Sequence, residues 1–258
     1  MASDPVSLRG VVLQSREFKD HDRIISFLSS ESGVIDICVK GSSGGKGSKF
    51  SAAAVPFIVM DVVITATGSF YYLKDFNIVF SNSGIMKSLE AMTCAGHIGK
   101  VLSSAYLDMT NAYKFYELAV YAFYNLSEKP DQFLLIYSAF NWRVLYLMGL
   151  SIRYDNCNNC KQALSGSAYL SFTDGQIYCA DCFEHSNKLY NGDFFLLTHS
   201  AVLALDHFIS CDIKQLFSVR LDESSLHKLV LFTTRYMNVQ LESDHDSLLR
   251  LLKDLNVI

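Results

Sequence analysis

The chain has 258 residues, of which 50% are hydrophobic and 19% are charged, a composition typical of a globular rather than a disordered protein. Its formal charge of −4 excludes a generally basic protein, so nucleic-acid binding would need a local basic patch. The longest apolar runs, Phe133–Trp142 and Ala52–Met60, are shorter than the roughly 20 residues that a membrane-spanning helix needs. The first residues also lack a signal-peptide pattern, so we expect a cytoplasmic protein without membrane contact.

The first eighty residues have the pattern of short β-strands. Val, Ile, Phe and Tyr dominate them, and turn dipeptides such as Ser32-Gly33 and Thr67-Gly68 separate them. The expected strands span Leu8–Gln14, Arg23–Leu28, Val34–Val39, Phe57–Ala66 and Phe70–Phe80. Such strands suit a small closed barrel, because closure removes exposed strand edges. We predict an OB-type barrel over residues 1–80, with an open sheet and a helix as the alternative.

From about Ser83 onward the hydrophobic period becomes helical. The segment Tyr113–Leu126 is apolar nearly all round, which is typical of a buried helix. Pro130-Asp131 is a start signal and Gly149 a stop signal, so a further helix is predicted between them. Later helices are expected from Thr198, from Asp222 to Leu241, and over Ser247–Leu255.

Four of the seven cysteines form two C-x2-C pairs that are eighteen residues apart. They are Cys157, Cys160, Cys179 and Cys182. Two such pairs can complete a closed tetrahedral zinc site, and their separation fits that arrangement. The segments Tyr169–Phe172 and Gln176–Tyr178 can form a hairpin about Asp174-Gly175, which would bring the second pair back to the first. We predict one structural Zn2+ in a module over residues 154–190.

Other interpretations of these cysteines fit less well. A redox CxxC pair expects a βαβ setting, and a catalytic zinc keeps one coordination position open. His185 lies three residues after Cys182 and could replace a thiolate, but a surface histidine is the simpler interpretation. Cys38, Cys94 and Cys211 lie in apolar stretches and are expected to fill the core. The predicted fold class is therefore α+β: an N-terminal OB-fold barrel, then a helical domain over residues 81–258 with the inserted zinc module.

The sequence contains no recognisable catalytic motif. It has no glycine-rich phosphate loop, nucleophile elbow or His-Glu metal motif. Asp20-His21-Asp22 has suitable residue types, but on a strand His21 would point away from both carboxylates, and a solvated turn is the better interpretation. We expect a protein that is not an enzyme.

Several segments, in this order and spacing, resemble the RecO family of bacterial recombination mediators. The first is Gly10–Gly41, with a Glu31-Ser32-Gly33 turn and a closing Val39-Lys40-Gly41. Within it the matching residues are Arg16, Phe18, Asp20, Asp22 and Arg23. Pro56-Phe57 also matches, as does Phe140–Leu145 followed by Gly149 ahead of the first cysteine pair. The paired cysteines occur in many, though not all, members.

The resemblance implies a non-enzymatic mediator of DNA repair and recombination in the RecF pathway. Its OB fold would bind single- and double-stranded DNA, and a zinc-finger-like insert would lie in its helical domain. It would anneal complementary strands, cooperate with RecR, dock on the C-terminal tail of single-stranded DNA-binding protein (SSB) and help to load RecA. It would work on the bacterial nucleoid during repair. No covalent chemistry is implied.

An OB groove holds nucleic acid by a positive track and by aromatic side chains on which bases stack. The candidate DNA-binding residues are Arg9, Arg16, Lys19, Arg23, Lys40, Lys46 and Lys49, with Phe18, Tyr71 and Tyr72 for stacking. The alternative is that these are ordinary solubilising charges and core aromatics, since residues 1–50 carry seven basic and six acidic side chains. Where the family has a strongly basic, arginine-containing loop, residues 42–49 have lysines alone, so we expect fewer and more salt-sensitive phosphate contacts.

Arg143 is the candidate partner-binding residue. An arginine on an apolar helix surface can pair with the terminal carboxylate of the SSB tail, although it could equally pair with a neighbouring acid. Two other functions remain open. One is a protein-interaction adapter of the same fold with weak or no DNA binding. The other is a zinc-bearing nuclease or other DNA-modifying enzyme, for which an acidic metal cluster is missing.

Overall fold

The computed structural model describes residues 4–42, 50–68, 70–104, 111–152, 156–172, 175–186 and 193–254. The chain divides into two compact units, Met1–Asp131 and Gln132–Ile258, which we describe separately. No helix within the described ranges is long and apolar enough to cross a membrane. The predicted division into domains at residue 80 stays a prediction.

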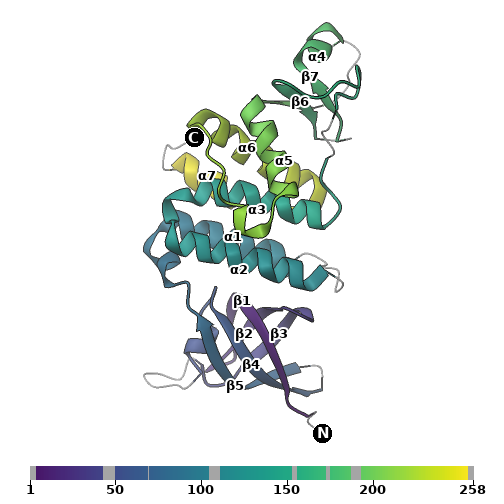
Figure 1. The fold of residues 1–258 in the computed structure, drawn as a ribbon. Helices are drawn as coiled ribbons and strands as arrows, with labels where there is room; N and C mark the ends of the chain where they lie inside the picture. The colour runs from purple at the N-terminus through teal and green to yellow at the C-terminus, as the bar shows by residue number, and fades with distance from the viewer. Residues whose placement is uncertain are drawn as a thin grey trace. The chain divides into compact units, whose positions relative to one another are not determined.

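The first unit begins with a closed five-stranded barrel, as predicted, in the order β1-β2-β3-β5-β4 (Figure 1). Its strands are β1 (Val6–Phe18), β2 (Asp22–Ser29), β3 (Gly33–Val39), β4 (Val59–Thr67) and β5 (Phe70–Phe80). Neighbours pair antiparallel except β3 and β5, which meet in parallel at Ile37–Tyr71 and Cys38–Tyr72. This short parallel contact closes the barrel, and it rules out the open sheet.

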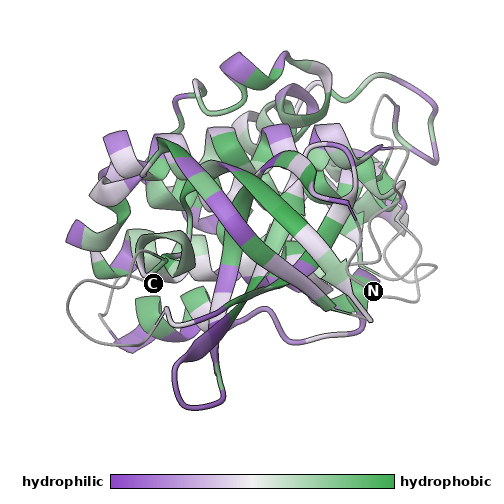
Figure 2. Ribbon diagram, turned by 90° about the horizontal axis from the view of Figure 1, so that it is seen from below, coloured by the Kyte–Doolittle hydropathy of each residue, from purple (hydrophilic) through white to green (hydrophobic). Residues whose placement is uncertain are grey.

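The barrel core follows from alternation along the strands. Hydrophilic and hydrophobic residues interleave along them, so that one face of each strand turns inward (Figure 2). The interior includes Val12, Phe27, Ile37, Met60 and Val62, all nearly inaccessible to water. A bulge in β1 between Val12 and Gln14 shifts the register against β2, so the two halves of this long strand present different faces.

Two helices complete the first unit: α1 (Leu89–Ser104) and α2 (Ala112–Glu128), after short 3-10 turns over Ala52–Ala54 and Ser83–Lys87. The α2 helix confirms the predicted helix, but it is not buried on all sides, because Tyr113 and Tyr124 are exposed. The α1 helix was not predicted as a separate element. Ser88 opens α1, because its Oγ accepts a hydrogen bond from the Ala91 N–H at 3.1 Å and donates one to Glu90 at 2.6 Å. The helix packs against β1.

The second unit is built around α3 (Phe133–Leu147), which packs against α5 (His199–Ser210) and α6 (Glu223–Leu241). Trp142 is fully buried, with its ring 5.6 Å from Phe232 and 5.2 Å from Tyr236. Thr198 and Asp222 cap α5 and α6 through side-chain hydrogen bonds, which confirms both predicted starts. A 3-10 turn, Pro130–Gln132, precedes α3, another spans Ile213–Gln215, and α7 (Ser247–Asp254) follows α6.

The cysteine module also belongs to the second unit. The predicted strand pairing is confirmed as β6 (Ala168–Ser171) and β7 (Ile177–Cys179), whereas Asp174 of the predicted turn lies outside the described residues. Two further elements were not predicted: α4 (Ala180–Ser186) and β8 (Phe194–Leu197). The strands form one sheet in the order β7-β6-β8. Phe172 packs against Phe232 of α6 at 5.5 Å, which ties the module to the helices of its own unit.

Candidate metal centre and nucleic-acid interface

The four predicted cysteines converge on one point. The sulfur atoms of Cys157, Cys160, Cys179 and Cys182 all lie within 4.8 Å of one another. A tetrahedral metal site with metal–sulfur bonds of about 2.3 Å would place its sulfurs about 3.8 Å apart. The cluster therefore has the size and the donor set to hold a metal ion with small adjustments.

Backbone hydrogen bonds place the two cysteine pairs beside each other. Residues 157–161 make a tight turn, in which the Lys161 N–H donates to the Cys157 carbonyl at 2.9 Å and Lys161 takes a left-handed conformation. The Asn158 N–H donates to the Ile177 carbonyl at 2.8 Å, and so this turn is fixed against β7. Cys179 ends β7 and Cys182 lies in the first turn of α4, which presents the second pair.

The environment of Cys157 favours a thiolate. Burial alone would raise its pKa, but N–H groups of Cys179, Cys160 and Asn159 point at the sulfur and lower the pKa to about 6. The Cys179 N–H lies 3.3 Å from this sulfur, and the Cys182 N–H lies 3.5 Å from the Cys179 sulfur. Such N–H donors stabilise the negative charge that metal-bound sulfur carries, so the residues present fit a metal ion.

The remaining thiols and His185 stand apart from this cluster. His185 is exposed, and its Nδ1 lies 2.6 Å from the Asp181 carbonyl within α4. Cys38 and Cys94 are buried and Cys211 is partly buried. Desolvation raises the pKa of each of these three thiols, as expected for cysteines that fill space.

Five of the aromatic and lysine candidates form one cluster at an end of the barrel. Phe18 ends β1, Lys40 follows β3, and Tyr71 and Tyr72 lie near the start of β5, opposite the end of β3. The ammonium of Lys19 lies 5.2 Å from the Phe18 ring, and that of Lys40 lies 4.7 Å from the Tyr72 ring.

Phe70, which was not among the predicted residues, joins them with its ring centroid 6.5 Å from that of Phe18. We call Phe18, Lys19, Lys40, Phe70, Tyr71 and Tyr72 the rim cluster. The side chains of Phe70 and Tyr71 are 46% and 40% exposed, although large aromatic residues normally lie in the core. Across the parts of the chain that the structure describes, neither lysine forms an ion pair. The rim cluster therefore combines two lysine charges that have no acidic partner among the described residues with two exposed aromatic residues, Phe70 and Tyr71.

The three arginine candidates have acidic or hydroxyl partners instead. Arg9 pairs with Asp61 through two hydrogen bonds of 2.7 and 2.8 Å, and Arg16 pairs with Asp36 at 2.7 Å. Arg23 donates to Ser15 Oγ at 2.8 Å and lies 3.9 Å from Glu17. The pairing holds the pKa of Asp61 below its ordinary value, through the hydrogen bond from Arg9. Neighbouring side chains therefore largely compensate the charges of these arginines, in contrast to the ammonium charges of Lys19 and Lys40.

Lys46 and Lys49 lie outside the described residues, but the start of their loop is fixed. The Gly41 N–H donates to Asp22 Oδ1 at 2.9 Å, and Gly41 adopts a positive φ of 65° that favours glycine. The chain thus leaves β3 at the rim cluster, directly after Lys40. Asp20 and His21 lie in an exposed turn, and Asp22 has this structural role.

Arg143 caps a helix. Its guanidinium donates to the carbonyls of Ile209 and Cys211, at 2.8 and 2.5 Å, where α5 ends. A cation at this position satisfies carbonyls that have no partner within the helix and complements the negative end of its dipole. Neither binding of a partner carboxylate nor pairing with an acid is tested by this geometry, so the partner role stays a prediction.

We expect Arg143→Met to destabilise the protein by about 1–3 kcal/mol, because it leaves these carbonyls without a donor while keeping most of the side-chain volume. Urea denaturation measures the effect. The control is Arg250→Met, whose ion pair with Asp244 is solvent-exposed and should contribute less than about 0.5 kcal/mol. Equal stability of both variants would contradict the capping role.

Comparison with known proteins assigns the family. Residues 1–82 match the model of the recombination protein O N-terminal domain, and residues 86–249 match that of its C-terminal domain. The chain belongs to the RecO family. It is 26% identical over 239 residues to the DNA repair protein RecO of Acetivibrio thermocellus, covering 93% of each chain. It is also 22% identical to the DNA repair protein RecO of Thermoanaerobacter sp. over 237 residues, which cover 92% of this chain and 93% of the relative. The identity to the DNA repair protein RecO of Bacillus subtilis is likewise 22%, over 175 residues that cover 68% of each chain.

The structure explains two glycines in the segments on which the resemblance to the RecO family rests. A Cβ atom on Gly10 would lie 2.4 Å from the Leu28 carbonyl, so the close pairing of β1 with β2 at this position requires glycine. Gly149, with a φ of 75°, ends α3: its N–H donates to the Tyr146 carbonyl and the Leu150 N–H donates to the Leu145 carbonyl. Both positions serve the fold rather than a binding site.

Proposed function

We propose that this RecO-family protein is a non-enzymatic mediator of DNA repair that binds single- and double-stranded DNA through its barrel. The observation that carries the proposal is the rim cluster. Lysines that have no acidic partner within the described part of the chain adjoin exposed aromatic residues there, which is the combination by which OB folds hold unpaired strands. Lys46 and Lys49 follow Lys40 in the sequence and would add to its positive charge. Relatives named DNA repair protein RecO support this role.

We further propose that the metal of the cysteine module is one structural Zn2+. Four thiolates are soft ligands that favour zinc, and four protein ligands leave no position for a reacting water. The ion would fix the shape of the module rather than contact DNA.

Family membership supports partners that follow from the resemblance: RecR, the C-terminal tail of SSB and, indirectly, RecA on single-stranded DNA. In this scheme the protein works in the bacterial cytoplasm, anneals complementary strands and helps to replace SSB by RecA. The guanidinium of Arg143 donates to two carbonyls at the end of α5. Its remaining N–H groups would donate to the carboxylate of the tail.

A second candidate function is a protein-interaction adapter with weak DNA binding. One observation favours it: Arg9 and Arg16 are both paired with carboxylates, which reduces the positive charge of the barrel surface. A strand-cleaving or other DNA-modifying enzyme ranks below both.

Single-strand binding separates these functions. We expect the wild-type protein to bind a fluorescent oligothymidine at low salt. The double variant Lys19→Ala/Lys40→Ala should bind it about tenfold more weakly. It should also reduce the slope of log affinity against log salt by about 1.4, because each lost phosphate contact removes about 0.7. The matched control, Lys114→Ala/Lys129→Ala, removes the same charge from exposed lysines on and after α2 and should stay within about twofold.

If the wild-type protein does not bind at low salt, the adapter function replaces the mediator function. Equal losses in the two double variants would show that net charge, rather than the rim cluster, determines affinity. Annealing of complementary strands, measured with and without SSB, should proceed without cleavage when Mg2+ or Mn2+ is added, whereas cleavage would indicate an enzyme.

A further inference from the structure

The end of β5 exposes three consecutive apolar side chains. Ile78, Val79 and Phe80 are 39%, 46% and 39% exposed, although alternate residues of a barrel strand should point into the core. A run of exposed apolar residues costs solubility and is uncommon on a protein surface unless it binds something. The end of β5 is therefore a candidate binding surface.

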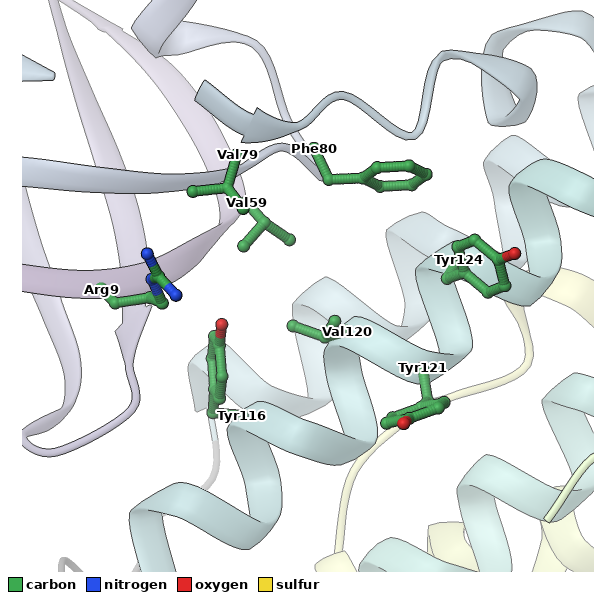
Figure 3. A pocket seen from close by; sticks show the side chains of 8 residues that line it. All are labelled: Arg9, Val59, Val79, Phe80, Tyr116, Val120, Tyr121 and Tyr124. Carbon is green, nitrogen blue, oxygen red and sulfur yellow. The ribbon is translucent and has the colours of Figure 1, made fainter. Parts of the chain in front are cut away.

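A groove lies on one side of this strand end. It has a volume of about 440 Å³ and is formed by β1, β4, β5 and α2 of the first unit (Figure 3). We call it the β5–α2 groove. At one end Phe80 and Tyr124 form an aromatic pair with ring centroids 5.5 Å apart, and at the other Arg9 and Tyr116 approach each other (Figure 3). Its volume is in the range of specific binding pockets.

The charge of the groove argues against nucleic acid. Among the residues that the structure describes, Arg9 is the only charged one that lines the groove, and Asp61 compensates this charge through two hydrogen bonds. A phosphate backbone would gain little here, since its affinity depends on uncompensated cations. The groove also lies roughly 23 Å along β5 from the rim cluster, counted from Tyr72 to Val79 at about 3.3 Å per residue. It can thus be occupied independently of DNA.

Two polar groups at the groove select for a hydrogen-bond acceptor. Arg9 uses Nε and Nη2 for Asp61, and within the described residues Arg9 Nη1 and the Tyr116 hydroxyl have no hydrogen-bond partner. Burial raises the pKa of Tyr116, so its hydroxyl is neutral and able to donate. A main-chain carbonyl is an uncharged acceptor that both donors suit.

We propose that the β5–α2 groove docks a partner protein that inserts a large, uncharged apolar side chain and presents a main-chain carbonyl to Arg9 and Tyr116. Tyrosine, phenylalanine and arginine line the groove, and these residues are enriched at the centres of protein interfaces and among their energetic hot spots. The site goes beyond the proposed DNA binding and does not depend on it.

A selection of random dodecapeptides displayed on phage against the full-length protein tests the proposal. We expect the enriched peptides to share an aromatic or branched apolar residue without a common charge. Val79→Asp should weaken a selected peptide about tenfold, because it places a charge in an apolar contact, and Tyr116→Phe should weaken it about threefold. The matched control is Val6→Asp, a barrel valine that is 49% exposed against 46% for Val79 and does not line the groove.

Several outcomes would overturn the proposal. A selection without enrichment, or peptides that bind Val79→Asp as well as the wild-type protein, would show that the groove docks no such segment. Light scattering that finds a wild-type dimer and a Val79→Asp monomer would assign the groove to a second copy of the chain. Loss of oligothymidine binding in Val79→Asp, with Val6→Asp unaffected, would make it a nucleic-acid subsite. Normal DNA binding with lost peptide binding supports the proposal, and failure of DNA binding in the wild-type protein alone leaves the peptide result valid.

Discussion

Removal of the metal should unfold the cysteine module. We expect the purified protein to contain one Zn2+ per chain, and both Cys157→Ser and treatment with a strong chelator to abolish it. Structural zinc binding supplies about 10–16 kcal/mol in isolated zinc modules, which is comparable with the whole stability of an ordinary domain at about 5–15 kcal/mol. The loss cannot be absorbed by the small sheet β7-β6-β8.

Hydrogen exchange locates the effect. Protection should disappear from β6 to β8 in the metal-free protein, and the stacked rings of Tyr169 and Phe183, 3.9 Å apart, should lose their near-ultraviolet signal. His185→Ala is the control, because this histidine is exposed and bonded within α4, and it should keep one Zn2+ per chain. A zinc-free protein that stays folded but loses only DNA binding would contradict a structural role.

The strands could be predicted from sequence because each has a local signal. Alternation, β-branched residues and glycine-containing turns mark β1 to β5, and only their ends shift by a few residues. The cysteine cluster was equally predictable, since C-x2-C spacing is itself a consequence of metal geometry. In both cases the residue spacing along the chain follows directly from the geometry, of a strand in one case and of a metal site in the other.

Contacts between distant segments had no such signal. Whether Arg9 meets Asp61 or open solvent depends on the register of β1 against β4, which no local pattern specifies. Phe18 and Phe70 lie on strands far apart in the chain, and Phe70 joined the rim cluster only through the closure of the barrel. The elements α4 and β8 are short and depend on the module around them.

The helix α1 was missed for a different reason. It contains Thr93, Cys94, Gly96 and Gly99, which are weak helix formers. Packing of the helix on the barrel, rather than propensity, explains why it forms. The small residues of α1 permit this packing. Gly99 lies close to the backbone of β1 and Gly96 does not, so substitutions of these two glycines test the contact between helix and barrel.

Gly99→Ala should destabilise the first unit by about 1–3 kcal/mol, as overpacked sites do. A Cβ atom on Gly99 would lie 2.5 Å from the carbonyl oxygen of Leu13, which is part of the backbone and cannot rotate away. Leu13 lies in the β1 bulge, where it has no register partner on β2. The bulge and the glycine therefore act as a matched pair that lets α1 lie directly on the strand.

Gly96→Ala is the control on the same helix. Gly96 is exposed, and its added Cβ would meet nothing within 4 Å, so the better helix propensity of alanine should stabilise the protein by about 0.5–1 kcal/mol. Urea denaturation of the two variants should therefore give changes of opposite sign. Stabilisation by both would show that α1 can move off the barrel at little cost. Opposite signs would show that the backbone contact between Gly99 and Leu13 fixes the helix on the strand.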